Sequence, residues 1–288
     1  MAVDDGCRSR RVVSLIRHVF NAESGSARSC RLRAVHLGGC RFRLRSPSRV
    51  DCGTEIVHAR IAQFLSTFES GNTLPDGPLT VRWSTPATKA LPPRIAVILH
   101  AHYPDVALEL INAVNDMGLA FDLFVTTSRG DVSEAIHTNV PSNARATTVF
   151  EVENFGRDVM PFIRILDTIG LDQYAAVLKL HTKKTVGQSY GDVWRDEIIG
   201  QLIPAVSHAK SFLARLDTTG WGILGPSSFL LTDSSRFWGA NRARTTKLRR
   251  RFSYVGGSHD LEFFAGTMLW FKPAALQNLP NIVREESW

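Results

Sequence analysis

From Arg94 onward, short apolar runs alternate along the chain with stretches of helical spacing. The run RIAVILH over 94–100 is β-branched and contains no turn residue, which is typical of a strand buried on both faces of a parallel sheet. Apolar residues then recur at helical spacing over 106–117, and Gly118 closes this predicted helix. A second predicted strand, over 121–127, follows directly. This succession predicts a βαβ unit.

The same alternation continues to the end of the chain. It predicts a helix from Asp131, a strand over 146–152, a helix over 159–169, a strand over 175–180, a helix over 193–216 and strands over 221–224 and 266–271. Alternating elements of this length favour an α/β fold with a doubly wound, mostly parallel sheet. We therefore predict one α/β domain over residues 94–288.

Residues 1–93 differ from the rest of the chain in amino-acid composition and lack its regular apolar pattern. They mix Arg, Ser and Gly, and their best candidate for an amphipathic helix is Ala59–Phe68. Pro86, Pro92 and Pro93 then mark a linker or a domain edge. We expect this N-terminal segment to be basic and partly disordered.

The positive charge of the chain is concentrated at its start. The net charge is +7, and residues 1–50 contribute +8 through eleven arginines against three acidic residues, which leaves −1 for the remaining 238 residues. General attraction to anions therefore belongs to the head of the chain. No recognised nucleic-acid-binding motif accompanies this charge, so we expect no nucleic-acid partner. Contact between the head and an anionic membrane surface is the alternative.

Cysteine spacing and hydropathy bear on the cellular compartment. The four cysteines, Cys7, Cys30, Cys40 and Cys52, match neither a metal knuckle nor a nucleophile signature, and we expect them to be reduced in the cytoplasm. No apolar run reaches the roughly 18–20 residues of a transmembrane helix, and the arginine-rich start lacks the apolar region of a secretory signal. A soluble protein is expected.

Polar residues follow three of the predicted strands. In an open parallel sheet the ligand crevice lies outside the carboxyl ends of the strands. His100, His102 and Tyr103 follow the first strand, Asn154–Asp158 follow the third, and His181–Lys184 follow the fourth. The sequence therefore predicts a polar, anion-binding site at this edge of the sheet.

The segment Asn154–Asp158 (NFGRD) places a glycine and an Arg-Asp pair immediately before a helix. Gly156 permits a tight turn or a close backbone approach, and a helix N-terminus favours anions. Asp158 fits either an N-cap or a hydrogen-bond acceptor for a ligand. Arg157 fits either a ligand contact or a surface salt bridge.

The segment His181–Lys184 (HTKK) delivers three potential cations, His181, Lys183 and Lys184, from a strand end. Such a group of cations is suited to binding a phosphate group, and a solvated basic loop is the alternative. No neighbouring residue has metal-ligand spacing to His181. Further candidates lie in the motifs GDVWR, WGAN and HDLE, where Trp194 is also typical of a core residue: they are Asp192, Trp194, Arg195, Trp238, Asn241, Asp260 and Glu262.

Seven motifs in a fixed order carry a resemblance to a known family. They are HAHYPD, FDLFVTTS, ENFGRDVMPF, LKLHTKK, GDVWR, WGAN and FFAGTMLWFKP. Over about Ile95–Leu276 the chain resembles the rhamnan synthesis F family, which comprises bacterial glycosyltransferase-like proteins of cell-wall polysaccharide and O-antigen (lipopolysaccharide) assembly. Family members are expected to continue past the FKP motif, where this chain soon ends.

The resemblance implies a function, partners and a fold. It implies transfer of a sugar, typically L-rhamnose from dTDP-L-rhamnose, to a lipid-linked glycan at the cytoplasmic face of the membrane. A non-catalytic domain that binds a sugar nucleotide or glycan beside a partner glycosyltransferase is the alternative. The order of elements is similar to the Rossmann-type GT-A plan of glycosyltransferases.

The GT-A comparison also assigns roles within the site. In that plan an Asp-x-Asp motif holds a divalent metal on the diphosphate, and HTKK stands in its place here. We expect cationic side chains to stabilise the diphosphate without a metal or other cofactor, with Mg²⁺ or Mn²⁺ as the alternative. The predicted donor-binding residues are His100, Tyr103, Asn154, Gly156, Arg157, His181, Lys183 and Lys184, and the acceptor-side residues are Trp194, Arg195, Trp238 and Asn241. The predicted catalytic carboxylates are Asp260, which is favoured as the base, Glu262, Asp158 and Asp192.

Overall fold

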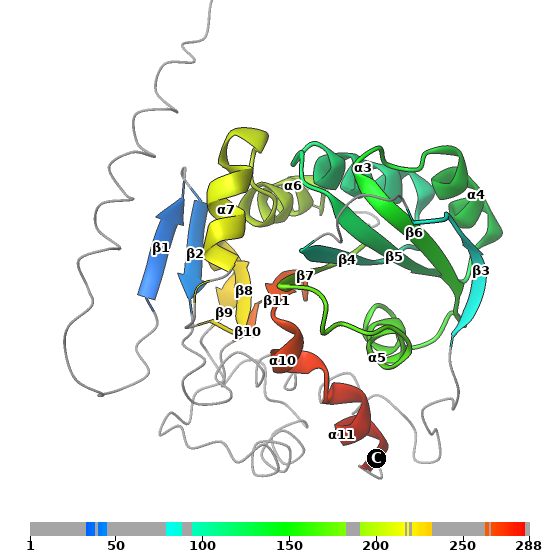
Figure 1. The fold of residues 1–288 in the computed structure, drawn as a ribbon. Coiled ribbons are helices and arrows are strands. Elements are labelled where there is room, and N and C mark those ends of the chain that lie inside the picture. The colour runs from blue at the N-terminus through cyan, green and yellow to red at the C-terminus, as the bar shows by residue number, and fades with distance from the viewer. Residues whose placement is uncertain are drawn as a thin grey trace, which may run out of the picture.

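The computed structural model of the chain describes residues 33–37, 40–44, 79–87, 94–182, 191–216, 218, 221–231, 263–264 and 266–285 (Figure 1). The strands are β1 (Arg33–Leu37), β2 (Cys40–Leu44), β3 (Thr80–Ser84), β4 (Ile95–His100), β5 (Phe121–Thr127), β6 (Ala144–Glu151), β7 (Ala176–His181), β8 (Ile223–Pro226), β9 (Leu230–Leu231), β10 (Phe263–Phe264) and β11 (Leu269–Phe271). The helices are α3 (Pro104–Asn115), α4 (Gly130–Thr138), α5 (Val159–Thr168), α6 (Gly191–Leu202), α7 (Ala209–Leu216), α10 (Pro273–Leu276) and α11 (Leu279–Glu285), with short 3-10 turns at Val206–His208 and Ser227–Phe229. No helix in these segments combines the length and apolar character needed to cross a bilayer.

The strands form one large mixed sheet in the order β1-β2-β8-β11-β7-β4-β5-β6-β3, and β9 and β10 form a separate pair. The four central strands β7, β4, β5 and β6 are parallel. All other neighbours in the sheet are antiparallel. The α/β class is thus confirmed, and the prediction of a mostly parallel sheet is wrong. Strand direction could not be read from the sequence because antiparallel β11 is as fully buried as β7, which belongs to the parallel part of the sheet.

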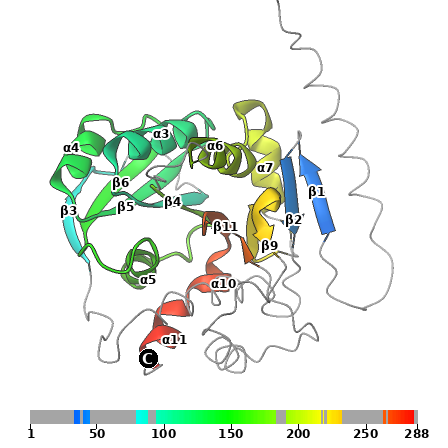
Figure 2. The same cartoon turned by 180° about the vertical axis from the view of Figure 1, so that it is seen from behind.

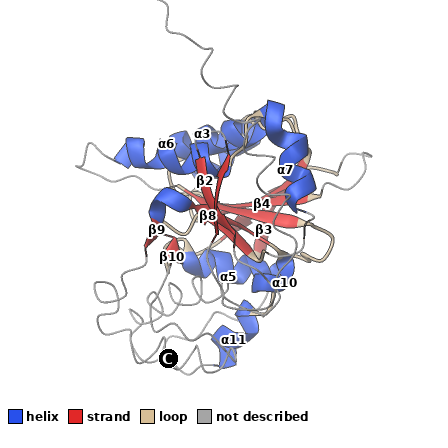
Figure 3. Cartoon of the chain, turned by 90° about the vertical axis from the view of Figure 1, so that its left-hand side faces the viewer, coloured by secondary structure: helices blue, strands red, loops and turns tan. Residues whose placement is uncertain are grey.

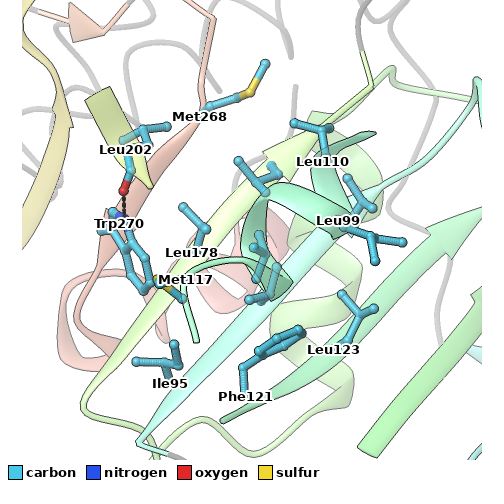
Figure 4. Close-up of a cluster of buried hydrophobic side chains, with 14 of the residues drawn as sticks. Ile95, Leu99, Leu110, Met117, Phe121, Leu123, Leu178, Leu202, Met268 and Trp270 are labelled. Atoms are coloured by element: carbon cyan, nitrogen blue, oxygen red, sulfur yellow. Dashed lines mark hydrogen bonds between the residues drawn. The ribbon is translucent and has the colours of Figure 1, made fainter. Parts of the chain in front are cut away.

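Helices cover both faces of the sheet, as a doubly wound arrangement requires. The helices α3, α4, α6 and α7 lie on one face and α5, α10 and α11 on the other, as two opposite views and an edge-on view show (Figures 1, 2 and 3). Side chains of β7 alternate between the two layers: Leu178 belongs to the core beneath α3 and α6, and Val177 to the core beneath α5. Trp270 of β11 is fully buried in the first core, and its indole N–H donates to the Leu202 carbonyl at 2.8 Å (Figure 4).

Several elements differ from their predicted extents. The helix predicted over 193–216 is two helices, α6 and α7, because Pro204 has no N–H to donate and disfavours helical geometry in the residue before it. The strand predicted over 266–271 is reduced to the three residues of β11. Strands β1, β2 and β3 come from the part of the chain before Arg94, for which no strand was predicted. The predicted helix Ala59–Phe68 lies outside the described residues.

The chain order locates the natural ligand crevice. From β4 the chain moves outward to β5 and β6 through α3 and α4 on one face, and α5 then returns it on the opposite face to β7, on the other side of β4. The boundary between β4 and β7 is therefore the topological switch point of the parallel strands. Ligands of open α/β sheets bind beyond the carboxyl ends of the strands at this point.

Candidate functional site

A row of polar side chains crosses the carboxyl edge of the sheet at the switch point. His100 ends β4 and lies in register with His181 of β7 on one side and Thr126 of β5 on the other. Ile98, two residues before His100 in β4, packs in the core beneath α5. Because side chains alternate along a strand, His100 and the residues in register with it face the same side as Ile98, toward α5. Two of the strand ends chosen from the sequence are thus adjacent in space.

A buried ion pair lies beneath this row. Lys179 Nζ is 2.8 Å from Asp158 Oδ2, and the Lys179 side chain is only 4% exposed. The Thr267 hydroxyl donates to the same carboxylate oxygen at 2.7 Å, and His181 Nδ1 is 3.4 Å from it. Lys179 also donates to the Thr267 carbonyl at 3.0 Å. Asp158, Lys179, His181 and Thr267, here termed the Asp158 cluster, join β7, α5 and the segment that leads into β11.

The Asp158 carboxylate is held in its ionised form. Burial by itself would raise the pKa of Asp158, but His181, Lys179 and the hydrogen bonds from Lys179 and Thr267 together hold that pKa well below its usual range. The positive charge of Lys179 is correspondingly matched by the negative charge of Asp158. The interior of the site is therefore a compensated pair and adds little net positive charge for an anion.

Two left-handed loops converge on the Asp158 cluster. Gly156 (φ 75°) and Arg157 (φ 53°) form one loop, and Gly266 (φ 100°) and Thr267 (φ 58°) form the other. A β-branched residue such as Thr267 rarely adopts a positive φ, and such strain costs on the order of 1–3 kcal/mol at each of the two non-glycine positions, Arg157 and Thr267. Hydrogen bonds from Thr267 to Asp158 and from Lys179 to Thr267 offset this cost.

The structure distinguishes between the interpretations offered for NFGRD. Asp158 occupies the N-cap position of α5 but makes no capping hydrogen bond with its side chain, and its Oδ2 accepts hydrogen bonds from Lys179 and Thr267. Arg157 and Asn154 are exposed, and no acidic residue among those described forms a salt bridge with Arg157. Gly156 supplies the left-handed turn that the loop requires. Arg157 is thus presented at the edge of the switch point.

His100 is held as a neutral imidazole beside this cluster. Its Nδ1 is 3.1 Å from Thr126 Oγ1. Burial is the main cause that lowers the pKa of His100 to about 4. Lys179 and His102 lower this pKa further, whereas Asp158 and a backbone hydrogen bond to Thr126 raise it.

Thr182, directly after β7, forms hydrogen bonds with the segment that joins β4 to α3. Its hydroxyl accepts from the backbone N–H groups of His102 at 2.7 Å and Tyr103 at 3.3 Å, and its own N–H donates to the His100 carbonyl at 2.9 Å. The ends of β4 and β7 are thereby tied together. Tyr103 packs partly against the core and its ring lies edge-on to His102.

The remaining predicted residues are distributed as follows. Lys183, Lys184, Trp238, Asn241, Asp260 and Glu262 lie outside the described residues, and Asp192 and Trp194 lie in α6 without described side chains. Arg195 of α6 is buried, and its Nε donates to Glu109 of α3 at 2.9 Å, on the sheet face opposite α5. The acceptor-side roles stay predictions.

Pairing of β9 with β10 brings together Leu231 and Phe263, which flank the segment that contains WGAN and HDLE.

Lys179 and Thr267 were absent from the predicted site. A signal for Lys179 exists in the sequence: a lysine inside the apolar run AVLKLH must be buried on one face and therefore needs an acidic partner. Thr267 has only the weak signal of a glycine just before a strand.

Metal-binding potential can be assessed for the described residues. They contain no group of three or more His, Cys, Asp or Glu side chains placed to hold a metal ion. The Asp158 carboxylate is already bound by an ammonium and a hydroxyl group. Metal independence of the reaction stays a prediction.

Comparison with known proteins matches the chain to one family model and to two relatives. A family model described as rhamnan synthesis protein F matches residues 79–286, which include β3 and the whole switch point. The chain is also 28% identical over 194 residues to proteins named "Uncharacterized protein WxcX" from two strains of Xanthomonas campestris pv. campestris. This alignment covers 67% of the chain but only 28% of those relatives. No solved structure shows a significant match.

Proposed function

The chain belongs to the rhamnan synthesis protein F family, and from this premise we propose that it is a glycosyltransferase of bacterial cell-surface polysaccharide synthesis. The proposed reaction moves L-rhamnose from dTDP-L-rhamnose to a lipid-linked glycan at the cytoplasmic face of the membrane. The observation that supports it is the polar row His181–His100–Thr126 at the switch point, where α/β sheets bind nucleotides.

The donor diphosphate is proposed to bind at the outer rim of the site. Because Lys179 is neutralised by Asp158, we assign the diphosphate to the four cations predicted from the sequence, which are Arg157, His181, Lys183 and Lys184. Arg157 is exposed beside the N-terminus of α5, where a guanidinium can form paired hydrogen bonds with phosphate oxygens. Cations placed there would stabilise the departing nucleoside diphosphate directly.

The role proposed for Asp158 changes from base to positioning residue. A general base works best when its pKa lies near the working pH. The pKa of Asp158 is held far below that range and its carboxylate already accepts two hydrogen bonds. We therefore retain Asp260, Glu262 and Asp192 as candidates for the base, with Asp260 favoured, and assign Asp158 to holding the Arg157 loop.

The proposal is tested by assaying purified protein with dTDP-L-rhamnose and a lipid-linked acceptor. Transfer is expected, and Arg157→Gln is expected to raise the KM for the donor while leaving the folded state unchanged. Arg284→Gln, which removes the partly exposed ion pair between Arg284 and Asp167 near the C-terminal end of α5, is the control and should retain wild-type kinetics. Activity should persist in excess EDTA; loss in EDTA that Mg²⁺ or Mn²⁺ restores would refute metal independence.

A non-catalytic domain that binds a sugar nucleotide or glycan for a partner enzyme is the second candidate. It is favoured by the short span of the match, since the aligned part covers only 28% of the length of the WxcX relatives. Such a domain would bind dTDP-L-rhamnose without transferring or hydrolysing it. Turnover by the purified chain would exclude this candidate, and binding without turnover would establish it in place of the first.

A further inference from the structure

Thr267 combines an unfavourable backbone conformation with a hydroxyl group that has a charged partner. Its φ is 58°, a left-handed value that Gly or Asn adopts at lower cost than a β-branched residue. Strain of this kind persists where surrounding contacts fix it, and it clusters at ligand-binding and catalytic sites. The hydroxyl donates to Asp158 Oδ2 at 2.7 Å, across 109 positions of the sequence. The Thr267 side chain therefore joins the loop before β11 to the start of α5.

Two donors from different elements fix the Asp158 carboxylate. Lys179 reaches Oδ2 at 2.8 Å from β7, where its side chain is 4% exposed. Donors that approach one oxygen from separate elements restrict the rotation of a carboxylate more than a single donor does. Lys179 Nζ also donates to the Thr267 carbonyl at 3.0 Å, so the Thr267 backbone has a contact that does not involve its hydroxyl. Removing the hydroxyl alone therefore loosens Asp158 and keeps its charge partner.

Arg157 directly precedes Asp158 in the chain. It is exposed and has a φ of 53°, a conformation that costs a non-glycine residue free energy. The anchored Asp158 side chain holds the peptide that follows Arg157. If this anchor loosens, the chain can relax toward ordinary φ and ψ values, and the Cα–Cβ bond of Arg157 turns with it. The direction in which Arg157 leaves the loop thus depends on the hydrogen bonds to Asp158.

We infer that Thr267 is a positioning residue for the donor diphosphate: its hydroxyl holds Asp158, and Asp158 holds Arg157 in the conformation that binds phosphate. This inference rests on the proposed function, in which Arg157 contacts the diphosphate. The single hydroxyl proton of Thr267 is used on Asp158, and ionised phosphate oxygens only accept hydrogen bonds. Thr267 therefore acts through Asp158 and does not itself bind phosphate.

Calorimetric titration of the full chain with dTDP tests this role. Thr267→Val removes the hydroxyl and keeps the β-branch, and it should weaken dTDP by about 3- to 10-fold, whereas Thr267→Ser keeps the hydroxyl and should lose less than about 2-fold. Arg157→Gln removes the phosphate contact itself and should lose more, about 10- to 100-fold. Gly225→Ala crowds Phe264 in β10 and is the control for a general loss of stability; it should bind dTDP as the wild-type protein does.

A double-mutant cycle shows whether Thr267 acts through Arg157. Once Arg157→Gln has removed the positioned group, adding Thr267→Val should change the affinity by less than about 2-fold. The inference is overturned if Thr267→Val weakens dTDP as much in the Arg157→Gln background as in the wild-type protein. Equal affinities of Thr267→Val and Thr267→Ser, or of Thr267→Val and Gly225→Ala, would overturn it as well.

Failure of the inference is distinguishable from failure of the proposed function. Wild-type protein that binds neither dTDP nor dTDP-L-rhamnose would refute both. Wild-type binding that Arg157→Gln weakens and Thr267→Val does not would overturn the inference alone. Thermal unfolding controls for folding of each variant. If Thr267→Val does not fold, Thr267→Ala, which also lacks the hydroxyl but has no β-branch at the left-handed position, takes its place in the cycle.

Discussion

Lys179→Met removes the cation of the buried ion pair and keeps most of the side-chain volume. In the wild-type protein Lys179 Nζ donates to both Asp158 and the Thr267 carbonyl, and it lies over the Phe162 ring, 5.1 Å from the ring centroid. Methionine is apolar and can contact an aromatic ring through its sulfur. What it removes is the charge that balances the Asp158 carboxylate.

The expected loss is about 3 kcal/mol in the free energy of unfolding. Removing one partner of a buried ion pair costs about 3–5 kcal/mol because the other charge stays buried and uncompensated. The lower end applies because the Asp158 side chain is 18% exposed and keeps its hydrogen bond from Thr267. The double variant Asp158→Asn/Lys179→Met removes both charges and should be more stable than Lys179→Met alone.

Equilibrium unfolding in urea at neutral pH, followed by circular dichroism, measures this difference. Arg82→Met is the control, since the Arg82–Glu151 pair is similarly short, at 2.7 Å against 2.8 Å, but its carboxylate side chain is 53% exposed. It should cost less than about 1 kcal/mol. If Lys179→Met costs no more than Arg82→Met, or if the double variant is less stable than Lys179→Met, the buried pair does not organise the site as described.

Three further predictions concern the same region. The depressed pKa of Asp158 stabilises the fold above the unfolded pKa of about 3.9 and this contribution is lost as pH falls through the folded value, so Asp158→Asn should flatten the acid-unfolding curve below about pH 4. Thr267→Val removes the hydroxyl bound to a charged group and should cost about 1.5–3 kcal/mol in urea unfolding, while Thr267→Ser should cost less. Gly225→Ala would place a methyl group on the Phe264 ring and should lower stability by about 1–3 kcal/mol, whereas Gly130→Ala, with open space around it, should be tolerated in the same thermal unfolding assay.

The fold was predictable where it depends on the local sequence pattern. Between β4 and β7, the buried strands are short apolar runs, the helices repeat apolar residues at helical spacing, and glycines 118 and 170 follow the first and third helices. Strand direction and the joining of β3 and β11 to the sheet depend on partners distant in sequence. A strand's own residues do not encode those partners, so the mixed sheet emerged only from the structure.

The residues of the candidate site were likewise predictable only where they depend on the local sequence. By itself the sequence determined that His100, the NFGRD segment and His181 lie at the ends of strands or just beyond them, because strand ends are a local property. The tertiary structure decided that β4 and β7 are neighbours, that α5 brings Asp158 over Lys179, and that antiparallel β11 delivers Thr267 to the same carboxylate. These contacts join residues 21 and 109 positions apart. The physical reason is charge compensation: a buried lysine requires an acidic partner, but only the path of the chain through space selects Asp158.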